Sequence, residues 1–179
     1  MMSDENANMM AELKASFPPQ NDKPTRDLSK YVKTAAVLLA EDISPREYLM
    51  SAWLPMDSFG MVFAPRGIGK TWFAMVLAAS VAEGRSSFLG WRIHSSQTVL
   101  YVDGEMAKVD IRDRFERVMN RPLENLFILS SEELYRVGAP LCLDDAQDQT
   151  QFLDMLKVME ERGNRPQVII LDNLSTLRR

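Results

Sequence analysis

The chain has 179 residues and a formal net charge of −4, with 46% hydrophobic and 26% charged residues. This composition is ordinary for a globular protein with a sizeable core, and the negative charge argues against a generally basic nucleic-acid coat. The single cysteine, Cys142, excludes an intrachain disulfide and fits a reducing compartment.

The N-terminal residues Met1-Met2-Ser3-Asp4-Glu5-Asn6 lack the basic start and the apolar core of an export signal. The longest apolar stretch covers residues 72–82, far short of the roughly 20 residues that a membrane-spanning helix needs. We therefore expect a cytoplasmic protein that has no membrane partner.

The first part of the chain predicts a tail and a lead-in. Residues 1–30 are polar and hold three prolines, so they bury too little apolar surface to offset ordering and predict a disordered polar tail. Residues 31–52 predict a short helical lead-in, because apolar residues recur at helical spacing between Tyr31 and Leu39. Within it, Ser44-Pro45-Arg46-Glu47 resembles a capping box, which predicts a second short helix to about Ser51.

The main domain is expected over residues 53–179, and its first motif is a phosphate-binding loop. Residues 64 to 71 read Ala-Pro-Arg-Gly-Ile-Gly-Lys-Thr, between an apolar segment predicted as a strand (61–63) and an apolar segment predicted as a helix (72–82). In such a loop, backbone N–H groups curl around phosphates and the helix adds the positive end of its dipole. The placement predicts binding of a nucleoside triphosphate.

The loop pattern also assigns individual roles. Lys70 is expected to reach the β- and γ-phosphates, both in binding and in catalysis, and the Thr71 hydroxyl to bind Mg²⁺. Ala64 departs from the usual first glycine, so a Gly-Pro turn before a helix that begins with lysine stays open as the alternative. The expected nucleotide-binding residues are Ala64, Pro65, Arg66, Gly67, Ile68, Gly69, Lys70, Thr71 and Trp72.

The rest of the chain alternates strands and helices. Strands are predicted at 98–102, 126–129 and 168–171, helices at 107–120 and from Asp144 or Asp145 to Gly163, and a small hairpin between Phe88 and Gln97. Alternation of this kind predicts an α/β fold in which a parallel sheet carries helices on both faces. Ligands bind such sheets at the carboxyl ends of the strands.

Two acids follow predicted strands. Asp172 comes directly after the aliphatic run 168–171, where nucleotide-hydrolysing folds hold Mg²⁺. The next residue, Asn173, carries an amide, which cannot accept the proton of an attacking water, so the general base must lie elsewhere.

Glu105 is the candidate for the base, because it lies just past the strand 98–102 and a carboxylate there can orient water for in-line attack. Asp103 is the weaker rival. The alternative is that both acids only favour the N-terminus of the following helix through its dipole.

Four segments resemble a known group of proteins, the RecA-like P-loop ATPases, and in particular the RepA-like hexameric replicative helicase ATPases (AAA-type ATPases) of plasmids, phages and mobile elements. These segments are Phe63 to Thr71, Phe88-Leu89-Gly90-Trp91, Tyr101-Val102-Asp103-Gly104-Glu105-Met106, and Ile170-Leu171-Asp172-Asn173-Leu174-Ser175-Thr176-Leu177. The resemblance implies an ATP- and Mg²⁺-dependent motor for DNA replication. In the full-length protein it also implies a homo-oligomer, a hexamer, that acts on single-stranded DNA.

The resemblance further implies that the core continues past Asp172 with additional strands and DNA-contacting loops. The chain stops at Arg178-Arg179, so we expect a truncated gene product or a fragment in which the C-terminal part of the core is missing. Two alternatives stay open: a non-catalytic nucleotide-binding or assembly module, and a small-molecule phosphotransferase that uses the same loop.

Overall fold

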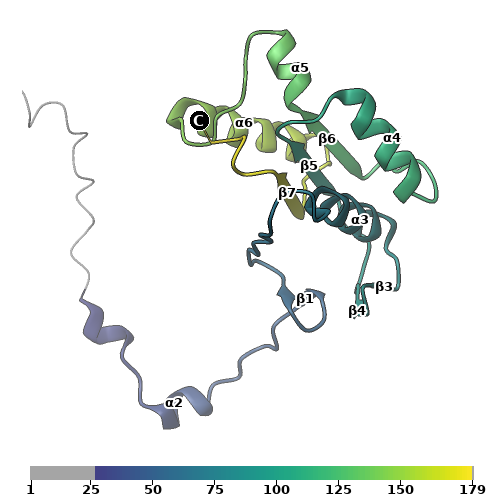
Figure 1. Cartoon of the computed structure of the whole chain (residues 1–179). Helices are drawn as coiled ribbons and strands as arrows, with labels where there is room; N and C mark the ends of the chain where they lie inside the picture. Colours follow the sequence, from purple (N-terminus) through teal and green to yellow (C-terminus); the bar gives the residue numbers. More distant parts are fainter. Residues whose placement is uncertain (1–26, 179) are drawn as a thin grey trace, which may run out of the picture. The chain divides into compact units, whose positions relative to one another are not determined.

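The computed structural model describes residues 27–178 (Figure 1). The chain divides into two compact units, Met1–Ser44 and Pro45–Arg179. Most of the tail predicted over residues 1–30 lies outside the described residues.

The described part of the first unit contains two short helical segments, the 3₁₀ helix η1 (Leu28–Tyr31) and the helix α2 (Ala35–Leu39). Thr34 caps α2, because its side-chain oxygen accepts a hydrogen bond from the amide of Val37 at 3.3 Å. Neither segment contains a buried residue. The apolar spacing near residue 35 therefore does specify a short helix.

The helix predicted from the capping box at residues 44–47 is wrong. Tyr48–Met50 form the strand β1, which pairs antiparallel with β2 (Leu54–Pro55). Leu49 and Met50 are buried in the same apolar cluster as residues of the long helix α3 (Lys70–Glu83). Burial of these side chains outweighs the local capping signal, because tertiary packing routinely overrides weak local propensities.

The main sheet has three parallel strands, and their order is β6-β5-β7 (Figure 1). The parallel pairing was predicted from the sequence, and the order was not. The strands are β5 (Val99–Asp103), β6 (Leu126–Ser130) and β7 (Val168–Asp172). In this register Asp103 lies opposite Asp172, so the two carboxylates end neighbouring strands.

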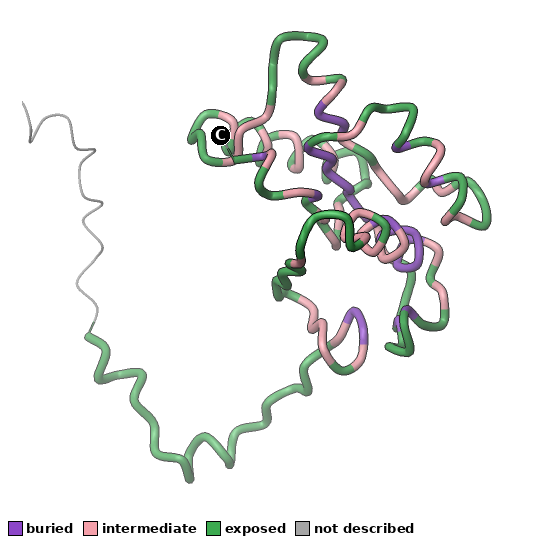
Figure 2. The backbone as a smooth tube through the Cα atoms, in the orientation of Figure 1, coloured by how far each residue is buried: buried purple, intermediate pink, exposed green. Residues whose placement is uncertain are grey.

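The sheet is covered on both faces. On the face of Val99 and Tyr101, the strands pack in one apolar cluster with α3 and with Ile111 and Phe115 of α4 (Lys108–Val118). On the opposite face, Leu100 and Val102 pack with α6 (Ala146–Glu161). Figure 2 shows the buried residues concentrated in β5 and α3. This arrangement confirms the predicted α/β fold.

Smaller elements complete the second unit. The hairpin predicted after α3 is present as β3 (Ser87–Phe88) and β4 (Trp91–Arg92). The short helix α5 (Ser131–Arg136), which follows β6 directly, was not predicted. Within residues 27–178, none of the helices combines the length and apolar composition that a membrane crossing requires.

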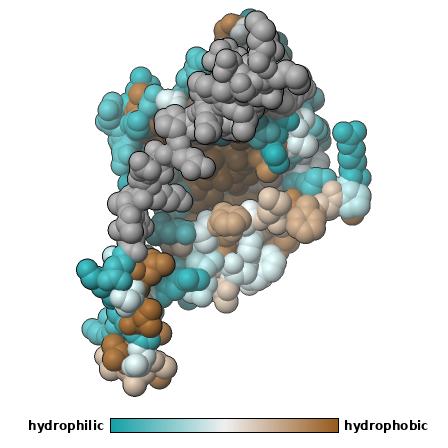
Figure 3. Space-filling model, turned by 90° about the vertical axis from the view of Figure 1, so that its left-hand side faces the viewer, coloured by the Kyte–Doolittle hydropathy of each residue, from teal (hydrophilic) through white to brown (hydrophobic). Residues whose placement is uncertain are grey.

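The strand predicted at residues 61–63 is wrong in the described structure. The segment has no regular secondary structure, and Phe59, Met61 and Phe63 are 94%, 66% and 83% exposed. Figure 2 shows this stretch as exposed, and Figure 3 shows apolar residues on the surface of one face of the molecule. A strand forms only where its backbone groups find a neighbouring strand, and β7, at the edge of the sheet, pairs with β5 alone among the described residues.

Candidate functional site

The loop before α3 has an open, left-handed turn at two glycines. Gly67 and Gly69 have φ angles of +82° and +99°, which glycine adopts without steric cost. A Cβ built at either position meets nothing within 4 Å, so space lies beside the backbone. Gly69 is the N-cap of α3 and supplies no side-chain hydrogen bond to the first turn. The amides that begin α3 are therefore free of a capping side chain, as an anion site requires.

Lys70 bends back over the same loop. Its Nζ donates hydrogen bonds to the carbonyl oxygens of Ala64 and Pro65, at 2.7 and 3.0 Å. Arg66 and Ile68 are exposed, and the guanidinium of Arg114 lies 5.4 Å from the centre of the Trp72 ring. The loop thus combines uncapped amides with an ammonium group, and this donor set fits a polyphosphate.

The ends of β5 and β7 carry a buried polar pair. The Tyr101 hydroxyl donates a hydrogen bond to Asp172 Oδ2 at 2.6 Å, and Asp172 is 7% exposed. Burial, and then the hydrogen bond to Asp172, raise the pKa of the Tyr101 hydroxyl. Tyr101 is consequently a fixed donor that orients the Asp172 carboxylate.

Asp103 lies beside this pair at the end of β5. Its Oδ2 accepts hydrogen bonds from the amides of Glu105 and Met106, at 3.2 and 2.9 Å, whereas its Oδ1 is buried without a hydrogen-bond partner. Burial raises the pKa of Asp103 to about 6, although the two amides oppose that shift. Asp103 therefore holds the backbone that leads into Glu105, a role that sequence reasoning missed.

The raised pKa of Asp103 predicts a pH-dependent loss of stability. An unfolded aspartate has a pKa of about 3.9, so between pH of about 4 and 6 the folded protein holds a proton that the unfolded chain has lost. The free energy of unfolding should fall across this window as pH rises, by up to about 3 kcal/mol from this group. We expect Asp103→Asn, which cannot ionise, to remove that contribution.

Urea unfolding of the wild type and of Asp103→Asn at pH 4 and pH 7 measures the difference. The variant should gain stability relative to the wild type at the higher pH, because contributions of the other acids cancel in the comparison. Parallel changes in the two proteins would contradict the assignment.

Glu105 is exposed, and its carboxylate is held by a neighbouring amide. Asn173 Nδ2 donates a hydrogen bond to Glu105 Oε2 at 2.8 Å. Glu105 follows β5 and Asn173 follows β7, so the parallel pairing of these strands brings the two residues together. Sequence analysis predicted both positions at the strand ends but did not anticipate the contact.

The predicted site residues form two groups in the described structure, the loop 64–72 and the acids at the strand ends. Glu105, Asp172 and the rival base Asp103 lie at the ends of β5 and β7, where Tyr101 and Asn173, which were not predicted as site residues, bond to them. Among residues 27–178, no hydrogen bond or ion pair links the loop 64–72 to Glu105 or Asp172. The loop precedes α3, and α3 packs against the sheet that carries the acids.

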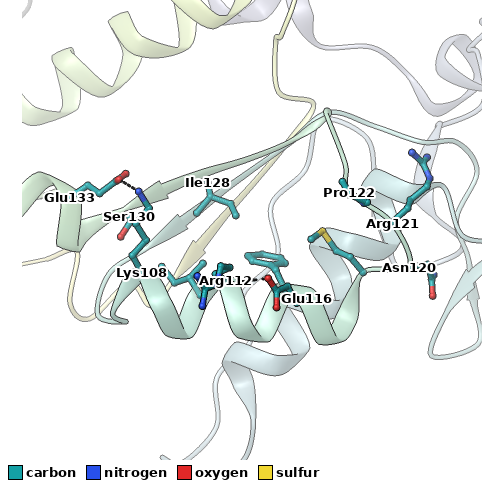
Figure 4. Close-up of a pocket in the computed structure, with 12 residues that line it drawn as sticks. Lys108, Arg112, Glu116, Asn120, Arg121, Pro122, Ile128, Ser130 and Glu133 are labelled. Atoms are coloured by element: carbon teal, nitrogen blue, oxygen red, sulfur yellow. Dashed lines mark hydrogen bonds and ion pairs between the residues drawn. The ribbon is translucent and has the colours of Figure 1, made fainter.

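A cavity of about 300 Å³ borders the predicted base. It is lined by Gly104, Glu105, Met106, Ala107, Ser131, Glu132 and Tyr135. A second, more apolar cavity of about 570 Å³ lies between α4 and β6, and none of the predicted site residues lines it (Figure 4). In Figure 4, Lys108, Arg112 and Glu116 follow one side of α4, while Ile128 and Ser130 lie on the facing strand. The cavity beside Glu105 is therefore the one that matches the predicted chemistry.

The α/β fold and the glycine-lysine loop define a nucleotide-binding protein of the P-loop ATPase type. The model of an AAA domain family, AAA_25, matches residues 25–179, so the chain belongs to this family. No curated protein and no solved structure was found to match the chain.

Proposed function

We propose that this chain binds ATP and hydrolyses it, as the RecA-like domain of a RepA-like replicative helicase from a mobile element. The observation that carries the proposal is the loop before α3. It has two left-handed glycines, an uncapped helix N-terminus and the Lys70 ammonium over the turn. These are the groups that bind the phosphates of a nucleotide.

In the proposed complex, the residues Ala64 to Trp72 hold the phosphates, and Lys70 exchanges its carbonyl partners for the β- and γ-phosphate oxygens. Thr71 and Asp172 are the proposed Mg²⁺ ligands, and that ion would neutralise charge on the phosphates. Tyr101 supports this assignment, because its hydrogen bond leaves the Asp172 carboxylate one defined orientation.

Glu105 is the proposed general base. Its carboxylate is exposed and borders a cavity, so a water molecule has access to it. The carboxylate would accept the proton of that water as its oxygen attacks the γ-phosphorus. Asp103 is less suited to this step, because it is 1% exposed and one of its oxygens is occupied by two backbone amides.

Single-stranded DNA is the proposed partner of the full-length protein, which is proposed to act as a homo-hexamer. Both proposals come from the resemblance to the RepA-like ATPases. Steady-state phosphate release from Mg-ATP, measured with and without single-stranded DNA, tests the DNA proposal together with hydrolysis, and the molar mass of the full-length protein in solution tests the hexamer. We expect multiple turnovers and a higher rate when DNA is present.

A second candidate is a nucleotide-binding or assembly module that does not hydrolyse ATP. The exposed, unpaired residues 59–63 favour it, because the loop is then not anchored by a strand on its N-terminal side. This candidate requires that Mg-ATP binds, as measured by calorimetry, but that no more than one phosphate per chain is released. Repeated turnover would exclude it.

A further inference from the structure

We propose that Asn173 is a positioning residue that holds the Glu105 carboxylate in its reactive orientation. The inference rests on the proposed role of Glu105 as the base. Its physical basis is the hydrogen bond of 2.8 Å between Asn173 Nδ2 and Glu105 Oε2.

The other side of the Asn173 amide fixes which atom faces Glu105. Asn173 Oδ1 accepts hydrogen bonds from the Thr176 amide at 3.0 Å, from the Thr176 hydroxyl at 3.1 Å and from the Ser175 hydroxyl at 2.5 Å. A backbone N–H only donates, so the oxygen must face Thr176. The NH₂ group must then face Glu105, and it only donates. The contact therefore presents a donor, and no competing acceptor, to the Glu105 carboxylate.

The segment that carries Asn173 is tightly joined to the loop that carries Glu105. The Gly104 amide donates to the Asp172 carbonyl at 2.8 Å. Gly104 is buried, and a Cβ built there would lie 2.2 Å from Thr176 Oγ1 and 3.2 Å from the Asn173 carbonyl oxygen. Leu177 then anchors the segment, because it is 1% exposed within the cluster under α6. A rigid support thus presents the Asn173 amide.

Glu105 needs such support, because its own surroundings hold it weakly. The residue is exposed, and among residues 27–178 its carboxylate makes no ion pair. An unrestrained glutamate samples many rotamers, and a misplaced base loses a large share of its rate. The amide of Asn173 removes that freedom without adding a competing charge.

Two substitutions distinguish the loss of the Asn173 NH₂ donor from the loss of the whole side-chain amide. Asn173→Ala removes the whole group, whereas Asn173→Asp keeps an oxygen for Thr176 and Ser175 but places an acceptor against the Glu105 carboxylate. For both variants we expect phosphate release to slow by about tenfold to a hundredfold. Binding of Mg-ATP, measured by calorimetry, should change less than about threefold, within ordinary context effects on one polar contact. Asn164→Ala, which removes an exposed amide just after α6 and away from the site, is the matched control and should retain the wild-type rate.

The outcomes distinguish this inference from the proposed function. If Glu105→Gln keeps wild-type turnover, the assignment of the base fails. If Glu105→Gln loses turnover but neither Asn173 variant does, the positioning role alone is overturned. Equal losses of affinity and rate in the Asn173 variants would also overturn it, since they indicate a purely structural role.

A spectroscopic measurement does not depend on turnover. In protein labelled with ¹⁵N-asparagine, the Asn173 side-chain amide signal is identified by its absence from Asn173→Ala. One of its protons should lie downfield in the wild type and move upfield in Glu105→Ala, because the hydrogen bond to a carboxylate is lost. An unchanged signal would overturn the contact in solution.

Discussion

Lys70→Ala is expected to weaken the binding of Mg-ATP by about a hundredfold, which corresponds to about 2.7 kcal/mol. The substitution removes the ammonium that lies over the loop and that is proposed to contact two phosphates. Hydrogen bonds to charged groups contribute about 1.5 to 3 kcal/mol each, and part of this gain is offset by the two carbonyl bonds that Lys70 gives up. Isothermal titration calorimetry of both proteins measures the effect.

The matched control for Lys70→Ala is Lys157→Ala on α6. It removes the same charge from an exposed side chain that pairs with Asp154 on its own helix. Its affinity should equal that of the wild type. Urea unfolding of each variant verifies that the loop change leaves the domain folded. If well-folded wild-type protein releases no heat with Mg-ATP, and Lys70→Ala behaves identically, the nucleotide site is excluded.

Glu105→Gln is expected to reduce the rate of phosphate release by about a hundredfold to ten-thousandfold, the range typical of a lost general base. The glutamine keeps the shape of the side chain and an oxygen that accepts from Asn173, but it cannot take a proton from water. Affinity for Mg-ATP should stay within a few-fold of the wild type, because the base acts in the transition state. Single-turnover phosphate release measures the rate of hydrolysis, and calorimetry measures the affinity for Mg-ATP.

Glu133→Gln provides the control for Glu105→Gln, because Glu133 is an exposed acid on α5 that pairs with Lys108. It should turn over ATP at the wild-type rate. Unchanged hydrolysis in Glu105→Gln would remove Glu105 as the base and return attention to Asp103, the other acid at the end of β5.

Elements with strong local signals could be predicted from the sequence. The aliphatic run of β7 and the β-branched run of β5 each specify a strand. Strand β5 is buried throughout, whereas Ile169 and Leu171 of β7, at the edge of the sheet, are exposed. The helices α3 and α6 end near Gly84 and Gly163, which have φ angles of +69° and +75°. The Asp145 side chain accepts from the amides of Gln147 and Asp148, so the predicted cap of α6 is also confirmed.

The errors share a physical cause, which is dependence on distant parts of the chain. Residues 44–47 carry a helix signal, yet Leu49 and Met50 are buried by packing that lies outside that window. Residues 61–63 have strand-like composition, but a strand also needs a partner edge, which composition does not encode.

The residues of the candidate site could be proposed from the sequence, but the contacts between them could not. Its acids and its loop follow from motif and from position at strand ends. The hydrogen bond from Asn173 to Glu105, and those that Asp103 accepts, depend on the register that sets Asp103 opposite Asp172. A shift of one residue between β5 and β7 would turn these side chains to the opposite face, and the sequence alone does not fix that register.

The close approach of Thr176 to Gly104 has a practical consequence for engineering. The residues after β5 and the residues after β7 interlock so closely that even a methyl group at position 104 overlaps Thr176 Oγ1. A transplanted segment 103–106 must therefore keep glycine at position 104. A donor segment with a larger residue there would need residues 172–177 from the same donor as well.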